Sequence, residues 1–484
     1  MDSNDIRSVA QTIAQNLNTI GSKAAIVIEG QTYTYADLKK MVSPLAIELN
    51  NKTRTDDRIG LHLQNNIKCY AGLIAILVSG RTYVPINEGF GLAQCQYIIH
   101  AASVKAIIRS NETAFIKDLL EKENIHSIEI IDENDDNITA NESSFAYLLF
   151  TSGSTGDPKG VPISHSNLDH FIHGITSCDD WTFKYDDKFI QPFNLSFDLF
   201  VFTTFLPLFI GATLVSVPLQ KISLHAAMLL ETEKISVSLF LPSHMMLINK
   251  VTHGKTYDQL RLSFFCGEAL YASDLKQWQQ RSPNAKQINI YGPTEATVAF
   301  SKYIWSEDSE EQCLNDIVPI GKPFGHNKMA LLPLDNDEKE LLLAGPQVFE
   351  NYLKPKNNTF VTLKNEKYYR TGDICERNEN GDYLFKGRND GQVKIGGHRI
   401  ELADVENKIK KVLPERHVIA IKKVHEDNLT SIHVFIIGQE IVGIQEKLDR
   451  SLPNYMRPTS IRFIDEFPTN LNGKIDRKKL KAQI

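Results

Sequence analysis

The segment 148–160, LLFTSGSTGDPKG, has hydroxyl side chains, glycines and one lysine directly after three apolar residues. Ser and Thr hydroxyls together with successive Gly amides can surround an anion, and Lys159 adds a positive charge. A phosphate-binding turn is the functional interpretation, and a Gly- and Ser-rich surface loop is the alternative. Pro158 and Gly160 flank Lys159, whereas a Walker P-loop needs Gly before the lysine and a hydroxyl after it. No GxGxxG follows an early strand either, so a dinucleotide-binding fold is a poor match.

The surrounding sequence alternates short apolar runs with amphipathic segments, which is the pattern of an α/β fold. In open parallel sheets, ligands gather beyond the carboxyl ends of strands, and the segment 148–160 lies in such a position. Near residue 390 the pattern changes to that of a small α+β domain, with an amphipathic helix expected over 402–412. Strands are expected at 24–29, 58–63, 104–109, 127–131, 237–241, 262–266, 287–291, 417–424, 431–437 and 461–464, and further helices at 272–280 and 444–452.

Length and charge limit the class of protein. A chain of 484 residues is too long for one hydrophobic core, so several domains are expected. The formal charge of -6 does not indicate a nucleic-acid-binding protein and favours a small-molecule enzyme. Residues 391–484 carry 17 Lys and Arg against 12 Asp and Glu, about +5, so a basic small domain follows an acidic large one.

Cysteine usage and the amino terminus predict the compartment. The six Cys occur singly, without the close pairs of a zinc site or a secreted disulfide framework, and are expected to be reduced. The first residues lack the basic start and apolar core of a signal peptide, so a cytoplasmic protein is expected. The uncharged segment 199–219 is long enough to cross a bilayer, but Pro207 and Gly211 favour a buried helix, a turn and a strand.

Six further motifs follow the phosphate turn in a fixed order: FNLSFDLF (193–200), FFCGEAL (264–270), YGPTEAT (291–297), YRTGD (369–373), GRNDGQVKIGGHRIEL (387–402) and NLNGKIDRKKL (470–480). The chain thereby resembles the adenylate-forming superfamily of acyl-CoA synthetases, luciferases and nonribosomal peptide adenylation domains over essentially its whole length. The resemblance implies a large domain, 1–389, of two doubly wound sheets with a small β-barrel subdomain, and a small mobile α+β domain, 390–484.

The resemblance also implies the reaction: a carboxylate attacks the α-phosphate of ATP, pyrophosphate leaves, and the acyl group passes to a thiol. Such phosphoryl chemistry depends on positioning and on neutralising phosphate charge. Thr294 is expected to bind the α-phosphate, Glu295 to bind Mg2+, and Lys474 to bridge the substrate carboxylate and the phosphate. Asp390 matches the family's hinge. The nucleotide-binding residues are expected to be Thr151, Ser152, Ser154, Thr155, Lys159, Gly267, Tyr291, Gly292, Asp373 and Arg388.

The substrate is expected to be an amino acid. Asp198 matches the acidic residue that binds the substrate ammonium in amino-acid-activating members, and the alternative is a helix cap. The pocket has no second charged group and several bulky side chains, which predicts a small uncharged amino acid. The sequence most resembles D-alanine:carrier protein ligases, so D-alanine is favoured over glycine, L-alanine and proline. The remaining pocket residues are expected to be Leu199, Phe202, Phe240, Phe264, Cys266, Ile290, Val298 and Ala299.

The expected acceptor is the phosphopantetheine thiol of a separate carrier protein, because no DSL-like carrier motif follows Leu480. Carrier proteins are typically acidic, which suits the basic small domain. A monomer without nucleic-acid or membrane partners is expected. The alternatives are an acyl- or aryl-CoA ligase, in which Asp198 is structural, and a non-enzymatic nucleotide-binding protein.

Overall fold

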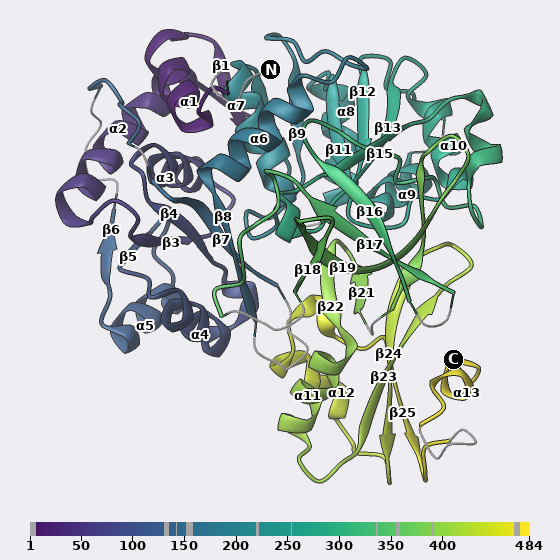
Figure 1. Ribbon diagram of the computed structural model, residues 1–484. Coiled ribbons are helices and arrows are strands. Elements are labelled where there is room, and N and C mark those ends of the chain that lie inside the picture. Colours follow the sequence, from purple (N-terminus) through teal and green to yellow (C-terminus); the bar gives the residue numbers. More distant parts are fainter. Residues whose placement is uncertain are drawn as a thin grey trace. The chain divides into compact units, whose positions relative to one another are not determined.

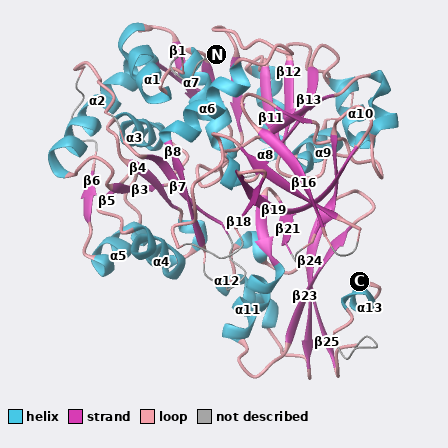
Figure 2. Cartoon of the chain, viewed as in Figure 1, coloured by secondary structure: helices cyan, strands magenta, loops and turns pink. Residues whose placement is uncertain are grey.

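The chain divides into two compact units in the computed structural model (Figures 1 and 2). Unit 1 comprises Met1–Glu88, Leu92–Phe150 and Gly160–Gly387, and unit 2 comprises Gly89–Gly91, Thr151–Lys159 and Arg388–Ile484. The structure describes residues 6–129, 135–141, 143–151, 158–218, 222–252, 254–334, 337–354, 359–389, 392–468 and 475–484.

A nine-stranded, mostly parallel sheet forms one layer of unit 1, in the order β15-β14-β13-β12-β11-β9-β10-β1-β2. Its central strands are buried on both faces and therefore read as apolar runs, such as AAIVI in β1. Antiparallel strands occupy both edges. The strands are β1 (Ala24–Ile28), β2 (Gln31–Thr34), β9 (Lys188–Gln191), β10 (Thr213–Ser216), β11 (Val237–Phe240), β12 (Leu262–Phe265), β13 (Lys286–Tyr291), β14 (Ser301–Ile304) and β15 (Lys322–Pro323).

A second sheet has six strands in the order β6-β5-β3-β4-β7-β8. Helix α3 follows β3 on one face, whereas α4 and α5 cover the other face (Figure 1). Strands β3 and β5 are neighbours whose following loops lead to opposite faces, which is a topological switch point. The strands are β3 (Arg58–His62), β4 (Thr82–Ile86), β5 (Ala106–Ile108), β6 (His126–Ile128), β7 (Phe145–Thr151) and β8 (Lys159–Ser164).

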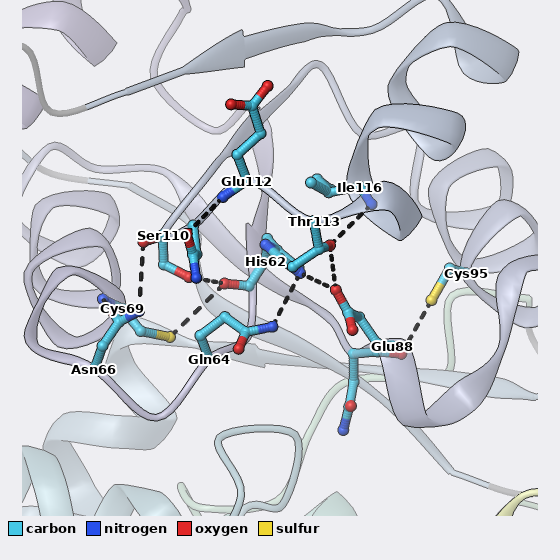
Figure 3. Close-up of polar contacts among 12 residues, drawn as sticks. His62, Gln64, Asn66, Cys69, Glu88, Cys95, Ser110, Glu112, Thr113 and Ile116 are labelled. Carbon is cyan, nitrogen blue, oxygen red and sulfur yellow. Dashed lines mark hydrogen bonds and ion pairs between the residues drawn. The ribbon is translucent and has the colours of Figure 1, made fainter.

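Polar side chains tie together the carboxyl ends of β3, β4 and β5 (Figure 3). The buried His62 lies with Nε2 2.9 Å from Glu88 Oε1, and the Thr113 hydroxyl donates to the same carboxylate oxygen. The Ser110 hydroxyl donates to the His62 carbonyl at 2.8 Å. These bonds fix three loops of the sheet relative to one another.

The helices of unit 1 pack on these two sheets. Their starts carry local signals, for example the reciprocal capping box between Thr34 and Asp37 at the start of α2. The helices are α1 (Val9–Thr19), α2 (Tyr35–Lys52), α3 (Ile67–Val78), α4 (Leu92–Ala102), α5 (Ala114–Glu123), α6 (His165–Thr176), α7 (Leu206–Ile210), α8 (Ile222–Thr232), α9 (Pro242–Val251) and α10 (Ala272–Arg281), with short turns η1 (Glu88–Phe90), η2 (Val201–Phe205), η3 (Thr294–Ala296) and η4 (Glu307–Gln312).

An antiparallel five-stranded sheet completes unit 1, in the order β16-β17-β19-β18 with β20 paired to β19. It corresponds to the subdomain that the resemblance predicts as a small β-barrel. The strands are β16 (Lys328–Pro333), β17 (Lys339–Ala344), β18 (Phe360–Leu363), β19 (Glu366–Arg377) and β20 (Tyr383–Arg388).

Unit 2 is an α+β unit built on the three-stranded sheet β23-β24-β25 and the hairpin β21-β22. Helices α11 and α12 pack on one face of the sheet, and α13 packs on the other around Leu480. The elements are β21 (Gln392–Ile395), β22 (His398–Glu401), α11 (Leu402–Val412), β23 (Val418–Val424), β24 (Thr430–Ile437), α12 (Ile444–Ser451), η5 (Asn454–Met456), β25 (Ser460–Ile464) and α13 (Arg477–Lys481).

The described part of the uncharged segment, residues 199–218, folds as expected, into helix η2–α7, a left-handed Gly211 and strand β10. Among the described helices, none combines the length and the hydropathy that crossing a bilayer requires.

Candidate active site

Asp198 lies in the loop between β9 and a five-residue π-helix, Val201–Phe205. Single π-turns are rare and often occur at functional sites. The Asp198 side chain is half-buried, and the backbone carbonyl of Asp198 accepts a hydrogen bond from the amide of Val201 at 3.0 Å. Burial, and after it the charge of Asp198, raises the pKa of Tyr147 well above its usual value. The Tyr147 hydroxyl is buried and has no hydrogen-bond partner among the described residues.

A group of packed aromatic rings includes Phe202, four residues after Asp198 in the chain. The ring centroids of Phe202 and Phe264 are 4.9 Å apart, and Trp181 meets Phe264 edge-on at 5.2 Å. Phe183 stacks on Phe264 at 5.9 Å. The other expected pocket residues that lie in the same buried core are Leu199, Cys266, Ile290, Val298 and Ala299.

Phe240 does not belong to this group, which corrects the sequence prediction. Side chains alternate between the two faces of a strand, and Phe240 pairs in register with Phe265 rather than with Phe264. Its ring packs edge-on against Trp278 of α10, at 5.8 Å between centroids. Phe240 and Phe264 therefore face opposite sides of the sheet and cannot line one pocket.

Leu241, the residue after Phe240, lies next to Gly267 and Leu199. A Cβ on Gly267 would lie 2.8 Å from Leu241 Cδ2 and 3.6 Å from Leu199 Cδ1. Gly267 also has a left-handed φ of 93°. Leu241, Leu199 and Gly267 are thus neighbours, and Gly is required at 267 both by its conformation and by this close approach.

The YGPTEAT motif forms a tight turn that begins with the single 3-10 turn Thr294–Ala296. Glu295 is fully buried, and the hydroxyl of Tyr352 donates to its Oε1 at 2.6 Å. The amide of Phe349 donates to the Glu295 carbonyl at 2.8 Å. One segment of the chain therefore holds both the backbone and the side chain of Glu295.

The turn continues through two residues in a strained conformation. Thr297 and Val298 have φ values of 56° and 70°, and both are buried. The left-handed region costs a β-branched residue about 1–3 kcal/mol unless the surroundings enforce it. Gly292 allows the closure, because a Cβ there would lie 2.7 Å from both Ala299 Cα and Val298 O.

Tyr291 and Asp373 come together from distant positions in the sequence. The Tyr291 hydroxyl donates to Asp373 Oδ2, and both side chains are buried. The Asp373 amide donates to the Thr371 hydroxyl at 3.0 Å. The expected adenine and ribose contacts thus lie side by side.

Of the expected phosphate-binding residues, Thr151 ends β7 and Lys159 begins β8. Thr151, Lys159 and Arg388, which ends β20, belong to unit 2. Within this unit, Lys159 Nζ lies 3.4 Å from Glu401 Oε1. Five expected site residues lie outside the described residues: Ser152, Ser154, Thr155, Asp390 and Lys474.

Magnesium is the metal that the resemblance implies. Mg2+ in nucleotide-dependent enzymes is commonly held by one or two carboxylates together with substrate phosphates. Glu295 supplies one buried carboxylate, and the described residues contain no group of three or more His, Cys, Asp or Glu side chains suited to a metal. Glu295 together with phosphate oxygens of the substrate would make a donor set of the kind that holds Mg2+ in such enzymes. The role of Glu295 remains a prediction.

Comparison with known proteins defines the family. Residues 13–353 match the family described as AMP-binding enzyme, so the chain belongs to that family. It is an ATP-dependent, adenylate-forming ligase. The expected α/β fold, with a large amino-terminal part and a smaller carboxy-terminal one, is confirmed.

Individual relatives cover almost the whole chain. D-alanine--D-alanyl carrier protein ligases of Streptococcus agalactiae (strain NEM316) and Bacillus licheniformis (strain ATCC 14580) are each 28% identical, with 99% and 98% of this chain and 99% of each relative covered. The solved adenylation domain AlmE of Vibrio cholerae, in complex with glycyl-adenosine-5'-phosphate, has a TM-score of 0.87 at 25% identity, with 98% of this chain and 97% of that chain covered.

Proposed function

We propose that this enzyme activates a small uncharged amino acid, with D-alanine favoured, and transfers it to the phosphopantetheine thiol of a separate carrier protein. The observation that carries the proposal is Asp198, a half-buried carboxylate four residues before Phe202, which belongs to a group of packed, buried aromatic rings. A carboxylate beside apolar rings favours a cationic partner, which an amino acid supplies and a plain fatty acid does not.

The proposed chemistry has two steps. A carboxylate oxygen of the amino acid attacks the α-phosphorus of ATP, the bond to the β-phosphate breaks, and pyrophosphate leaves. The carrier thiol then loses its proton and attacks the acyl carbon, and AMP leaves with the oxygen to which the acyl group was attached. The first step needs charge neutralised on the phosphate oxygens, which is the role proposed for Thr294, Glu295 and Lys474. Bound Mg2+ would supply further positive charge there.

Substrate size follows from the aromatic rings. The proposed pocket residues Phe202 and Phe264 pack against each other, and Phe264 packs against Trp181, so a large substrate side chain beside them would have to displace at least one of these rings. Among small amino acids, the relatives named as D-alanine--D-alanyl carrier protein ligases support D-alanine, and a solved relative holds a glycyl adenylate.

The partner is proposed from the same relatives and from charge. The D-alanyl carrier protein in their names supports a carrier as acceptor. The net charge of about +5 on residues 391–484 favours encounter with an acidic carrier. A monomeric enzyme in the cytoplasm remains a prediction.

Amino-acid-dependent exchange of pyrophosphate into ATP tests the proposal. The panel contains D-alanine, L-alanine, glycine, proline and propionate, which is alanine without its amino group. We expect D-alanine to give the highest kcat/KM and propionate to give almost none. Exchange supported by propionate or by aryl acids instead would identify a CoA ligase and overturn the amino-acid assignment.

A further inference from the structure

The strained turn after Glu295 is held by a side chain from a distant segment. Gln347 is almost fully buried, with 1% of its surface exposed. Its Nε2 donates to the carbonyl of Ala299 at 2.8 Å and lies 3.5 Å from the carbonyls of Ala296 and Thr297. One amide group therefore faces three carbonyls of the same turn.

The orientation of the Gln347 amide is itself fixed. Asn327 Nδ2 donates to Gln347 Oε1 at 2.6 Å, so the NH2 group must face the turn. The Thr297 hydroxyl donates to the backbone carbonyl of Gln347 at 2.6 Å. These bonds join Gln347 to the left-handed Thr297 through both its side chain and its backbone.

The held turn carries two expected pocket residues, Val298 and Ala299. Val298 is β-branched with φ 70°, a conformation that persists only when its surroundings enforce it. Without the Gln347 amide, the carbonyl of Ala299 loses its 2.8 Å donor, although the carbonyl of Thr297 keeps the backbone amide of Ala299 at 2.9 Å, and the turn can relax toward ordinary dihedral angles. Such relaxation would move the side chain of Val298 and the backbone of Ala299.

We propose that Gln347, oriented by Asn327, is a positioning residue that sets the shape of the acyl pocket through the turn 296–299. The proposal rests on the proposed function, because that function places Val298 and Ala299 in the pocket. Gln347 acts on substrate selectivity through these residues and does not touch the substrate itself.

Gln347→Glu tests the proposal with nearly unchanged shape. The variant keeps the oxygen that accepts from Asn327 and replaces the NH2 donor by an oxygen that repels the carbonyl of Ala299. Asn167→Asp is the matched control. Asn167 Nδ2 donates to the carbonyls of Pro346 and Val348, at 2.7 and 3.2 Å, so this variant loses donors to the same segment but none to the turn. Asp at 167 keeps the oxygen that caps α6.

The readout is the ratio of kcat/KM between the carboxylate that the wild type uses best and its next larger homologue, measured by pyrophosphate exchange. We expect Gln347→Glu to lower this ratio about tenfold, which corresponds to one hydrogen bond. The ratio should recover at low pH, because a protonated carboxyl can donate to Ala299 again. Asn167→Asp should keep the wild-type ratio even if its melting temperature falls.

A purely structural role predicts a different pattern. Both variants would then lose stability and total rate while keeping the wild-type ratio, and that result would overturn the proposal. An equal change of the ratio in both variants would overturn it as well. Because the ratio is defined for whichever carboxylate the wild type prefers, the role of Gln347 is judged even if that carboxylate is not an amino acid. Gln347→Met, which has similar length and no amide, provides a second variant if Gln347→Glu does not fold.

Discussion

Replacing Tyr352 by Phe removes one hydroxyl from the buried contact with Glu295. The O–H···O distance is 2.6 Å, and the two side chains are 8% and 0% exposed. A hydrogen bond to a charged group contributes about 1.5–3 kcal/mol, and 1.36 kcal/mol corresponds to a factor of ten. If Glu295 acts on the phosphates of ATP through this fixed carboxylate, Tyr352→Phe should lower kcat/KM for ATP by about 10- to 100-fold.

The assay is pyrophosphate exchange at saturating amino acid, with ATP and MgCl2 varied separately. We expect the Mg2+ concentration for half-maximal exchange to rise as well. Tyr383→Phe is the control, because its hydroxyl donates at 2.7 Å to the carbonyl of Met329 and the substitution removes the same atom. Equal ATP and Mg2+ dependence in wild type and Tyr352→Phe, with only the melting temperature lowered, would refute the role given to this contact.

Two further substitutions test other parts of the structure. Burial raises the pKa of Asp169 to about 6, so the folded chain holds this proton more tightly than the unfolded chain, whose value is near 3.8. The contribution of Asp169 to stability is therefore full below pH 3.8 and lost as the pH rises through 6. Asp169→Asn should stabilise the protein by up to about 3 kcal/mol at pH 8 and by almost nothing at pH 3.5. Thermal unfolding at the two pH values measures this difference. A stabilisation that is the same at both pH values would contradict the prediction. Gly292→Ala places a methyl group 2.7 Å from Ala299 Cα and should lower both the melting temperature and the exchange rate, the rate more strongly. Wild-type exchange by this variant would show that the turn tolerates the shift.

Much of the fold could be predicted from local sequence. The strands expected at 237–241 and 262–266 are β11 and β12, and the helix expected at 272–280 is α10, each within one residue at either end. Apolar periodicity determines these elements because the strands are buried on both faces. The family could likewise be predicted, because its motifs are short, contiguous and ordered.

The features that the sequence could not predict depend on which face of a sheet a side chain occupies and on contacts between distant segments. Phe240 and Leu241 are neighbours in the sequence, and only the register with β12 shows that Phe240 faces Trp278. Side chains alternate between the two faces along each strand. Whether Phe240 and Phe264 share a face depends on the register between β11 and β12, which the sequence alone does not specify.

Tyr352 and Gln347 were missed for a different reason. Each lies about 50 residues from its partner, 57 for Glu295 and 48 for Ala299, in a segment without charged or metal-binding motifs. A hydrogen bond across such a separation is determined by tertiary packing, which a single sequence does not reveal.

The most direct test of the central claim is the ratio of kcat/KM for D-alanine over propionate, measured in the wild type and in Asp198→Asn. We expect a large ratio in the wild type and a fall of at least about 100-fold in the variant, because loss of one partner from a charge pair in a partly buried site costs about 3 kcal/mol or more. Asp198→Asn should also leave the KM for ATP nearly unchanged. An equal ratio in both proteins would show that Asp198 does not bind the substrate amino group and would contradict the account.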